Sequence, residues 1–186
     1  MIHLRPERPE DTAAIREVHR RAFGGEGEAG VVDEARAAGA AVLSMVAEET
    51  DGAEGLEPDG PEAGAAGLVV AHILYTRVTV SAEDGGEISL LGLGPVAVLP
   101  SHQDQGIGTR LIEASLEHLR AEGHAAVVVV GLPGYYPRFG FIPGSHWGLR
   151  WEVDAPEGVF MAAELSPGSL AGVRGVVRFR PEFAGV

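Results

Sequence analysis

The chain has 186 residues, 45% of them hydrophobic, and a formal net charge of −13. This length and composition suit one folded domain with a full core and exclude a chain that is disordered throughout. The sequence contains no cysteine and no lysine, so all 14 basic residues are arginine. Disulfides, thiolate catalysis, a Walker-type phosphate loop and a Schiff-base lysine are therefore excluded.

The acidic charge and the lack of long apolar runs bear on partners and location. A negative surface repels phosphate backbones, so we expect no nucleic-acid partner and a bias towards cationic or amine-bearing substrates. No segment approaches the roughly 20 apolar residues of a membrane span, and the first residues have no signal-peptide character. We therefore expect a cytoplasmic chain with no membrane partner.

The first third of the chain predicts helices between short strands. Apolar residues recur at helical spacing after Pro9-Glu10-Asp11, which suits a helix start, and Gly24 suits a helix end. In chain order the predicted segments are a strand at 2–5, an amphipathic helix from about 10 to 23, a loop at 24–30, a weaker helix at 31–38 and a strand at 42–47.

A segment rich in glycine, proline and acids follows at about 48–64, and we expect a mobile surface loop there. Two β-rich runs joined by a short turn then predict an antiparallel hairpin. The remaining predicted segments are hairpin strands at 66–80 and 88–98, a helix at 106–122, a strand buried on both sides at 127–130, and short elements at 139–142, 149–153, 159–165 and 175–179. Together they predict an α+β or mixed α/β layout around one sheet.

The most specific feature is the strand-to-helix junction Gln103-Asp104-Gln105-Gly106-Ile107-Gly108. A helix start presents backbone N–H groups without intrahelical partners and carries a partial positive charge, so it can bind phosphate without lysine. Gly106 and Gly108 leave the backbone open to a ligand. Gln103 and Gln105 are the only glutamines in the chain, which suggests a specific hydrogen-bonding need. On spacing alone, a tight turn that only permits close packing explains the glycines equally well.

This junction resembles the GNAT superfamily of N-acetyltransferases, whose Gln/Arg-x-x-Gly-x-Gly/Ala signature matches Gln103, Gly106 and Gly108. The stretch Val96-Ala97-Val98 stands where the family has its splayed strand. Residues 2–6 with 10–11, and Tyr135-Tyr136-Pro137-Arg138-Phe139-Gly140-Phe141, are similar to the family's first strand, helix start and late aromatic motif. Pieces at 93–95, 133–141 and 160–170 resemble its YhbS-like bacterial subgroup.

The resemblance implies a single N-acetyltransferase domain over 1–186, with about 143–186 completing the sheet. It implies a GNAT-like fold, in which about four helices flank a mostly antiparallel twisted sheet of about six to seven strands with a splayed parallel pair. It also implies acetyl-CoA as co-substrate and no metal. The backbone of Val96, Ala97 and Val98 would pair with the pantetheine arm. Beside Gln103, the pyrophosphate would be held by the amides of Asp104, Gln105, Gly106, Ile107, Gly108 and Thr109.

Acetyl transfer needs a neutral amine, donors to the developing oxyanion and a proton for the departing thiolate. By its place in the matched motif, Tyr136 is the candidate general acid, and its alternative role is packing in an aromatic cluster. The backbone N–H of Val98 is the candidate oxyanion donor. Strand 88–98 carries no acid where many family members have a glutamate. Three residues remain candidates for a base that acts through water, namely Glu87, His72 and Ser89.

Several alternatives stay open at this point. The chain is expected to acetylate a primary amine of a small molecule or a peptide by direct attack in a ternary complex. The rival is a catalytically inactive acyl-CoA-binding sensor or interaction module. A dinucleotide oxidoreductase lacks the Gly-x-Gly-x-x-Gly fingerprint after a first strand. The acceptor, and the choice between monomer and homodimer, are not fixed. Arg138 either makes local contacts or touches phosphate, and Trp147 and Trp151 either wall an acceptor pocket or pack.

Overall fold

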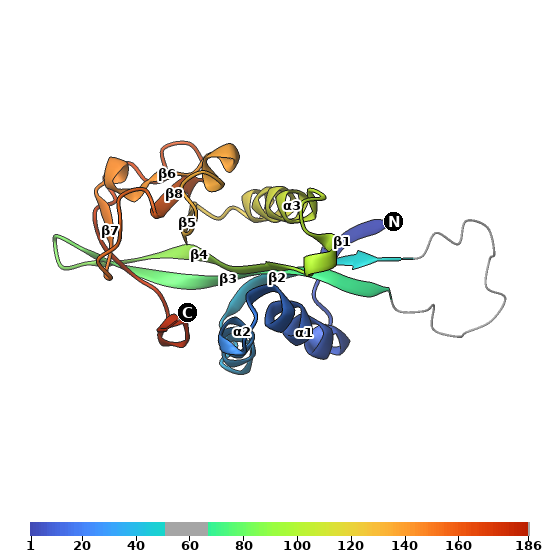
Figure 1. The fold of residues 1–186 in the computed structure, drawn as a ribbon. Coiled ribbons are helices and arrows are strands. Elements are labelled where there is room, and N and C mark those ends of the chain that lie inside the picture. Colours follow the sequence, from blue (N-terminus) through green and yellow to red (C-terminus); the bar gives the residue numbers. More distant parts are fainter. Residues whose placement is uncertain (51–66, 186) are drawn as a thin grey trace.

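A long β-hairpin runs through the whole molecule and organises the rest of it (Figure 1). Its strands are β3 (Leu68–Ala82) and β4 (Glu87–Val98). The structure is a computed structural model that describes residues 1–50 and 67–185. β-Branched and leucine side chains dominate β3, and most of them are buried. The hairpin is confirmed as predicted, with the turn at 82–86 closed by the Ala82 N–H donating to the Gly86 carbonyl.

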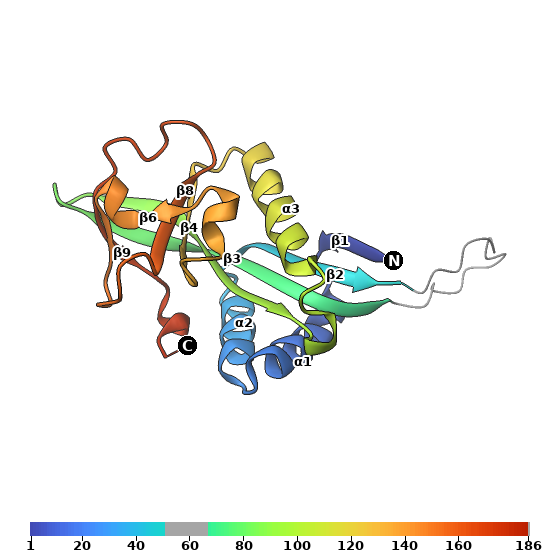
Figure 2. The same cartoon turned by 45° about the horizontal axis from the view of Figure 1, so that its top comes forward.

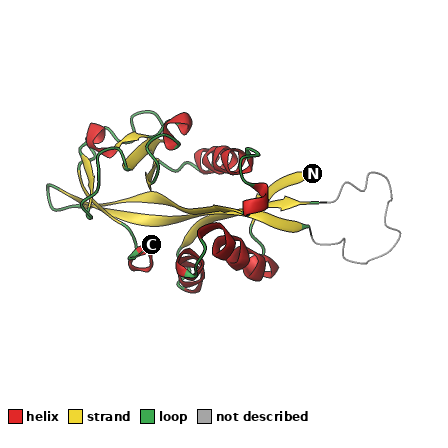
Figure 3. Ribbon diagram, in the orientation of Figure 1, coloured by secondary structure: helices red, strands yellow, loops and turns green. Residues whose placement is uncertain are grey.

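The other elements pack on or beside this hairpin, and Figure 3 distinguishes them by type. The strands are β1 (Ile2–Pro6), β2 (Ala41–Glu49), β5 (Ala126–Val130), β6 (Ile142–Pro143), β7 (Leu149–Trp151), β8 (Phe160–Glu164) and β9 (Gly175–Arg178). The α-helices are α1 (Thr12–Phe23), α2 (Gly27–Ala37) and α3 (Ile107–Ala121). Short 3-10 turns are formed by Pro9–Asp11, Pro100–His102, Tyr136–Phe139, Gly144–Trp147 and Pro181–Phe183.

All nine described strands belong to one sheet in the order β1-β2-β3-β4-β5-β8-β6, with β9 pairing both β3 and β7. Two pairs, β4–β5 and β7–β9, are parallel, and the other pairs are antiparallel. α1 and α2 cover one face of the sheet and α3 covers the opposite face (Figure 2). The mixed α/β fold with a parallel pair at β4–β5 is confirmed, and β5 is buried on both sides as its β-branched run predicted.

The structure differs from the expectation in its element counts. The described residues form nine strands because the C-terminal third adds short strands that pair for two to five residues each. They form three α-helices because the chain after β5 makes only the four-residue 3-10 turn Tyr136–Phe139. Pro137 lies in the first turn of this segment, and Gly140 ends it in a left-handed conformation with φ 88°.

The second helix also begins earlier than expected. Residues 27–30 were predicted to be loop because they are rich in glycine, yet α2 starts at Gly27. Burial of Ala29, Val31 and Val32 outweighs the poor helix propensity of glycine. In the expected loop at about 48–64, Glu48 and Glu49 end strand β2, and residues 51–64 lie outside the described part of the chain.

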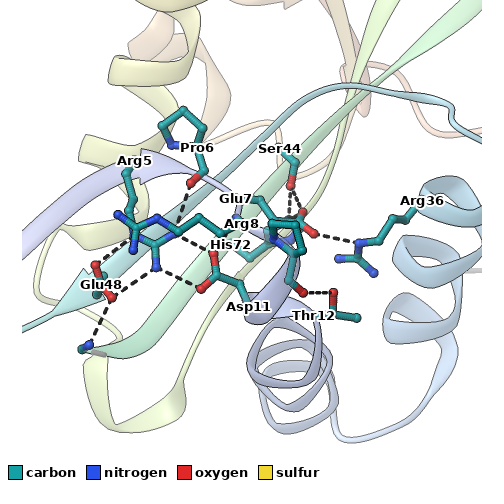
Figure 4. A network of polar contacts seen from close by, with 12 residues as sticks. Arg5, Pro6, Glu7, Arg8, Asp11, Thr12, Arg36, Ser44, Glu48 and His72 are labelled. Atoms are coloured by element: carbon teal, nitrogen blue, oxygen red, sulfur yellow. Dashed lines mark hydrogen bonds and ion pairs between the residues drawn. The ribbon is translucent and has the colours of Figure 1, made fainter. Parts of the chain in front are cut away.

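Two ionic clusters fasten the start of the chain to the sheet (Figure 4). In the first, the Arg5 guanidinium donates to Asp11 at 2.6 Å and to Glu48 at 2.9 Å. Asp11 also accepts the backbone N–H of Arg8 at 2.7 Å. The three charged side chains are mostly buried, so β1, β2 and the start of α1 are fixed relative to one another.

The second cluster centres on Glu7. Its carboxylate accepts a hydrogen bond of 2.7 Å from Arg36 on α2 and another from the Ser44 hydroxyl on β2, and it lies 3.6 Å from the ring of His72 on β3. Burial by itself raises the pKa of Glu7, but the contacts with His72, Arg36 and Ser44 outweigh burial and lower it to about 2. Glu7 therefore joins three elements through one charged group.

Replacing Glu7 by Gln should show how much this charge contributes. Because the pKa of Glu7 is lowered on folding, its contribution is full above the unfolded-state pKa and is lost as the pH falls towards 2. We expect the variant to lose about 2 kcal/mol at pH 7, allowing for the partial exposure of the carboxylate, and less at pH 3. Urea unfolding at both pH values measures the difference, and a loss independent of pH would contradict this account.

Among the helices that the structure describes, none combines the length and hydropathy that a membrane crossing requires.

Candidate active site

Strands β4 and β5 part in the middle of the sheet. Their parallel pairing covers Leu91 to Leu93 opposite Val127 to Val129, and β5 ends at Val130 while β4 continues to Val98. On its other edge β4 stays paired with β3 as far as Val98. From Gly94 to Val98, β4 thus has a strand neighbour on one edge only within the described residues.

The register fixes which backbone groups face the open edge. The Leu99 N–H donates to the Val70 carbonyl at 2.8 Å, so the Leu99 N–H faces β3. Alternation then directs the N–H and C=O groups of Val98 and Val96 away from β3. The side-chain amide of Gln103 already donates to the Val98 carbonyl at 3.0 Å. The open edge can therefore pair with an extended ligand.

Beyond β4 the chain turns and begins α3. The first helical hydrogen bond runs from the Arg110 N–H to the Gly106 carbonyl, so the N–H groups of Ile107, Gly108 and Thr109 precede the helical ladder. Gly106 has φ 76°, a left-handed conformation that favours glycine. Free N–H groups and the helix dipole together suit an anion at this point.

Residues 103–106, just before α3, are exposed, and their conformation and contacts shape this turn. The side chain of Gln105 donates to the Ser101 carbonyl at 3.0 Å, as Gln103 does to Val98. Asp104 adopts φ 60°, which is uncommon for a residue other than glycine. The hydrogen-bonding need suggested by the two glutamines is thus met within the turn itself, where both side chains stabilise the backbone.

Two tyrosines approach the open edge from the turn after β5. The Tyr135 hydroxyl lies 3.4 Å from the Thr109 hydroxyl in the first turn of α3. The Tyr136 ring packs over Gly131, just beyond β5, and its edge meets Tyr135 and Phe141. Burial, with a smaller effect of Tyr135, raises the pKa of Tyr136 to about 12. Its hydroxyl therefore stays protonated at neutral pH.

Arg138, in the same turn, makes local contacts. Its Nε donates to the Tyr135 carbonyl at 3.0 Å, and its guanidinium lies 4.7 Å from the centre of the Tyr135 ring. This cation–π contact holds Tyr135 against the start of α3.

A cavity of about 800 Å³ opens where the strands part. Its floor comes from Leu93, Val96 and Tyr136, and its lining also draws on Glu28 of α2 and on the C-terminal segment. Figure 1 shows α2 and the C-terminal segment on the same side of the sheet. The wall is largely apolar and includes Trp151 from the end of β7. Both Trp147 and Trp151 pack against the apolar cluster beneath the C-terminal strands, but Trp147 is not part of the cavity lining. The cavity connects the candidate acid to a surface that a small molecule can enter.

The three candidates for the base lie outside the lining of this cavity. Glu87 and Ser89 are exposed at the opposite end of β4, near the hairpin turn. His72 is completely buried beneath α1, where its Nδ1 lies 2.7 Å from His19 Nε2 and its Nε2 lies 2.8 Å from the Ser44 hydroxyl. None of them meets the described residues that surround Tyr136 in the cavity.

The buried histidines form a directed chain of hydrogen bonds. The Ser44 hydroxyl donates to the Glu7 carboxylate, so it must accept the Nε2 proton of His72. His72 Nδ1 then accepts from His19 Nε2–H. Burial lowers the pKa of both rings, to about 3 for His19, so both stay neutral. This geometry gives His72 a structural role in the sheet–helix contact.

Sequence reasoning missed two acids that line the cavity, Glu28 from the first turn of α2 and Glu152 after β7. Residues 24–30 were expected to be a loop, so the direction of the Glu28 side chain could not be predicted from the sequence. One feature of the sequence could have indicated the helix start. Glu28 stands just ahead of Val31 and Val32, and an acid in this position is typical of a first helical turn.

The chain matches known proteins along most of its length. Residues 3–144 match the family model described as an acetyltransferase (GNAT) domain. The chain belongs to the GNAT family of acetyltransferases.

Individual GNAT relatives extend the likeness to the C-terminal strands. The chain is 31% identical over 180 residues to the uncharacterized N-acetyltransferase YhbS of Escherichia coli K12, which covers 97% of each. The crystal structure of YhbS from Escherichia coli in complex with CoA aligns with a TM-score of 0.84 at 30% identity, over 98% of this chain and 91% of that one. A GNAT acetyltransferase from Brucella melitensis in complex with acetyl-CoA aligns with a TM-score of 0.74 at 34% identity, over 98% of both chains. The resemblance to GNAT enzymes and their YhbS-like subgroup is confirmed.

Gly131→Ala should test the placement of the Tyr136 ring. A Cβ at Gly131 would lie 2.3 Å from Tyr136 Cε2, so the ring must move. Gly134→Ala, three residues on, meets nothing within 4 Å and is the matched control. Because a displacement of about 1 Å can cost on the order of 100-fold in rate, we expect acetyl transfer to fall about 10- to 100-fold in the first variant only. Equal rates in both variants would show that Tyr136 does not need this position.

Proposed function

We propose that this GNAT protein transfers the acetyl group of acetyl-CoA to a primary amine by direct attack within a ternary complex. The observation that carries the proposal is the continuity of three features. These features are the start of α3, the open edge of β4 and the cavity. The open edge leads from the start of α3 towards Tyr136, and Tyr136 lines the cavity together with residues of α2 and of the C-terminal segment. One ligand can thus enter along the strand and a second through the cavity.

The residues at the open edge fit the chemistry of the CoA chain. In the proposal, the outward N–H and C=O of Val96 and the Val98 carbonyl, which also accepts from Gln103, pair with the pantetheine amides, and the Val98 N–H is kept for the thioester oxygen. The backbone groups of Ala97, between them, face β3. The turn from Gln103 to Gly106, with the free N–H groups of Ile107, Gly108 and Thr109, holds the pyrophosphate. A side chain at Gly108 would meet Val98 at 3.3 Å and Tyr135 at 3.6 Å.

Acetyl-CoA supplies the activated acetyl group as a thioester. The ammonium form of the acceptor first releases a proton to solvent, and the amine nitrogen then attacks the carbonyl carbon. The N–C bond forms, the C–S bond breaks and negative charge passes through the carbonyl oxygen to sulfur. In the proposal, the N–H of Val98 donates to the oxygen and the Tyr136 hydroxyl donates to the sulfur.

The raised pKa of Tyr136 constrains how its proton moves. A thiol has a reference pKa near 8.5, so full transfer from a phenol at about 12 to a free thiolate is uphill by about 5 kcal/mol. Tyr136 is therefore proposed to donate a hydrogen bond as the C–S bond lengthens. The Tyr136 proton then passes to the sulfur, and a proton from solvent or from the acetylated nitrogen restores the Tyr136 hydroxyl.

Binding of acetyl-CoA should be measured first, by thermal stability. Saturation at 100 times the dissociation constant should add about 2.7 kcal/mol. Gly108→Ala should weaken binding at least tenfold, because the added methyl crowds Val98 and the backbone that receives the pyrophosphate. Gly30→Ala in α2 has open space around it and should bind normally. No stabilisation of the parent protein by acetyl-CoA would exclude both the enzyme and an acyl-CoA-binding sensor.

Tyr136→Phe should separate the enzyme from an inactive sensor. We expect CoA release with amines to fall about 100-fold while acetyl-CoA binding is kept. In the parent, kcat/KM should rise with pH as the acceptor loses its proton. It should not fall by pH 10, because the pKa of Tyr136 is raised to about 12. Unchanged rates in Tyr136→Phe would remove this hydroxyl from the mechanism. An absence of turnover in the parent with every amine would favour the sensor.

A further inference from the structure

The cavity beside Tyr136 has an unusual rim. Phe23 is 46% exposed and Val153 is 51% exposed, and both line the cavity. Large apolar side chains left open to water around a hollow mark a surface that a ligand covers. The rim therefore favours a ligand with an apolar body.

Aromatic rings from the end of the chain form one wall. Trp151 meets Phe179 edge-on with ring centres 6.3 Å apart, and Phe179 meets Phe183 at 6.0 Å. All three line the cavity. Such a wall offers flat apolar area and ring faces that attract cations.

The charged residues of the lining differ in whether they are already paired. Arg178 lies 3.7 Å from Glu152, and Arg180 lies 2.7 Å from Glu182. Glu28 makes no ion pair or side-chain hydrogen bond within the described residues. The guanidinium groups of Arg178 and Arg180 each already face a carboxylate, although the buried Nε of Arg180 has no hydrogen-bond partner within the described residues. Glu28 offers a cation one uncommitted carboxylate in an apolar wall.

We propose that this cavity is the acceptor site and that it takes a compact amine on an aromatic or bulky aliphatic body, with Glu28 binding the ammonium group. The inference rests on the proposed function and narrows its acceptor. The volume of about 800 Å³ suits one small molecule, and its floor at Val96 and Tyr136 places that molecule beside the open edge of β4. A lysine side chain on a peptide would leave the aromatic wall largely uncovered.

The first experiment measures acceptor binding without acetyl-CoA. Trp147→Phe leaves Trp151 as the remaining tryptophan, so its fluorescence reports on the cavity. Titration with phenethylamine should change this emission. Glu28→Gln should weaken binding at least tenfold, whereas Glu26→Gln should not. Glu26 is the N-cap residue of the same helix, but it pairs with Arg16 on the surface and is not part of the cavity lining. Equal binding by both glutamine variants, or no change of emission, would overturn the inference whatever the protein catalyses.

The second experiment compares acceptors in turnover. With acetyl-CoA, kcat/KM for phenethylamine and tryptamine should exceed that for putrescine and for Nα-acetyl-lysine amide by at least tenfold. Glu28→Gln should raise the KM for the aromatic amines and leave the KM for acetyl-CoA unchanged. Turnover that favours putrescine or the lysine amide would overturn the proposed acceptor but keep the acetyltransferase. Turnover with no amine, despite phenethylamine binding, would contradict the proposed function and keep the cavity as an amine site.

Discussion

The backbone of β4 between Gly94 and Val98 has a partner strand on one side only, and this half-paired state is what the site depends on. Backbone N–H and C=O groups inside a protein cost free energy when they are left unpaired, so an open edge in the middle of a sheet must meet water or a ligand. The sheet tolerates it because β3 pairs with β4 along nearly its whole length. The long hairpin thus stabilises a strand whose second edge would be paired with another strand in a continuous sheet.

Parting the strands also determines where the other site groups lie. α3 begins after the turn at residues 99–106, and Gly108 in its first turn lies close to the Val98 side chain at the end of the open edge. The turn after β5 carries Tyr136 into the gap, and Gly131 is needed because the ring lies against its Cα. The ionic clusters around Arg5 and Glu7 fix α1 and α2 on the other face, which gives the cavity a firm wall.

Local patterns were enough to predict the part of the site that is continuous in sequence. The hairpin, the glycine-containing start of α3 and the buried run of β5 all follow from periodicity and turn chemistry, and the motif from Gln103 to Gly108 directed attention to the family. The cavity could not be predicted in this way. Its wall joins Glu28, Trp151 and Phe183, which only the three-dimensional arrangement brings together. Short strands such as β6 and β7 are likewise set by pairing with distant partners rather than by their own two or three residues.

Two of the three rings in the aromatic wall of the cavity, Phe179 and Phe183, come from the last described residues of the chain, after β9, whereas the open edge and the start of α3 lie near its middle. Much of the cavity wall and the open edge are therefore encoded by separate stretches of the sequence. Substitutions after Arg178 can reshape what enters the cavity without disturbing the turn at Gly106. In the proposed acceptor site, substitutions among these last residues can thus change which amine is bound while the open edge of β4 stays the same.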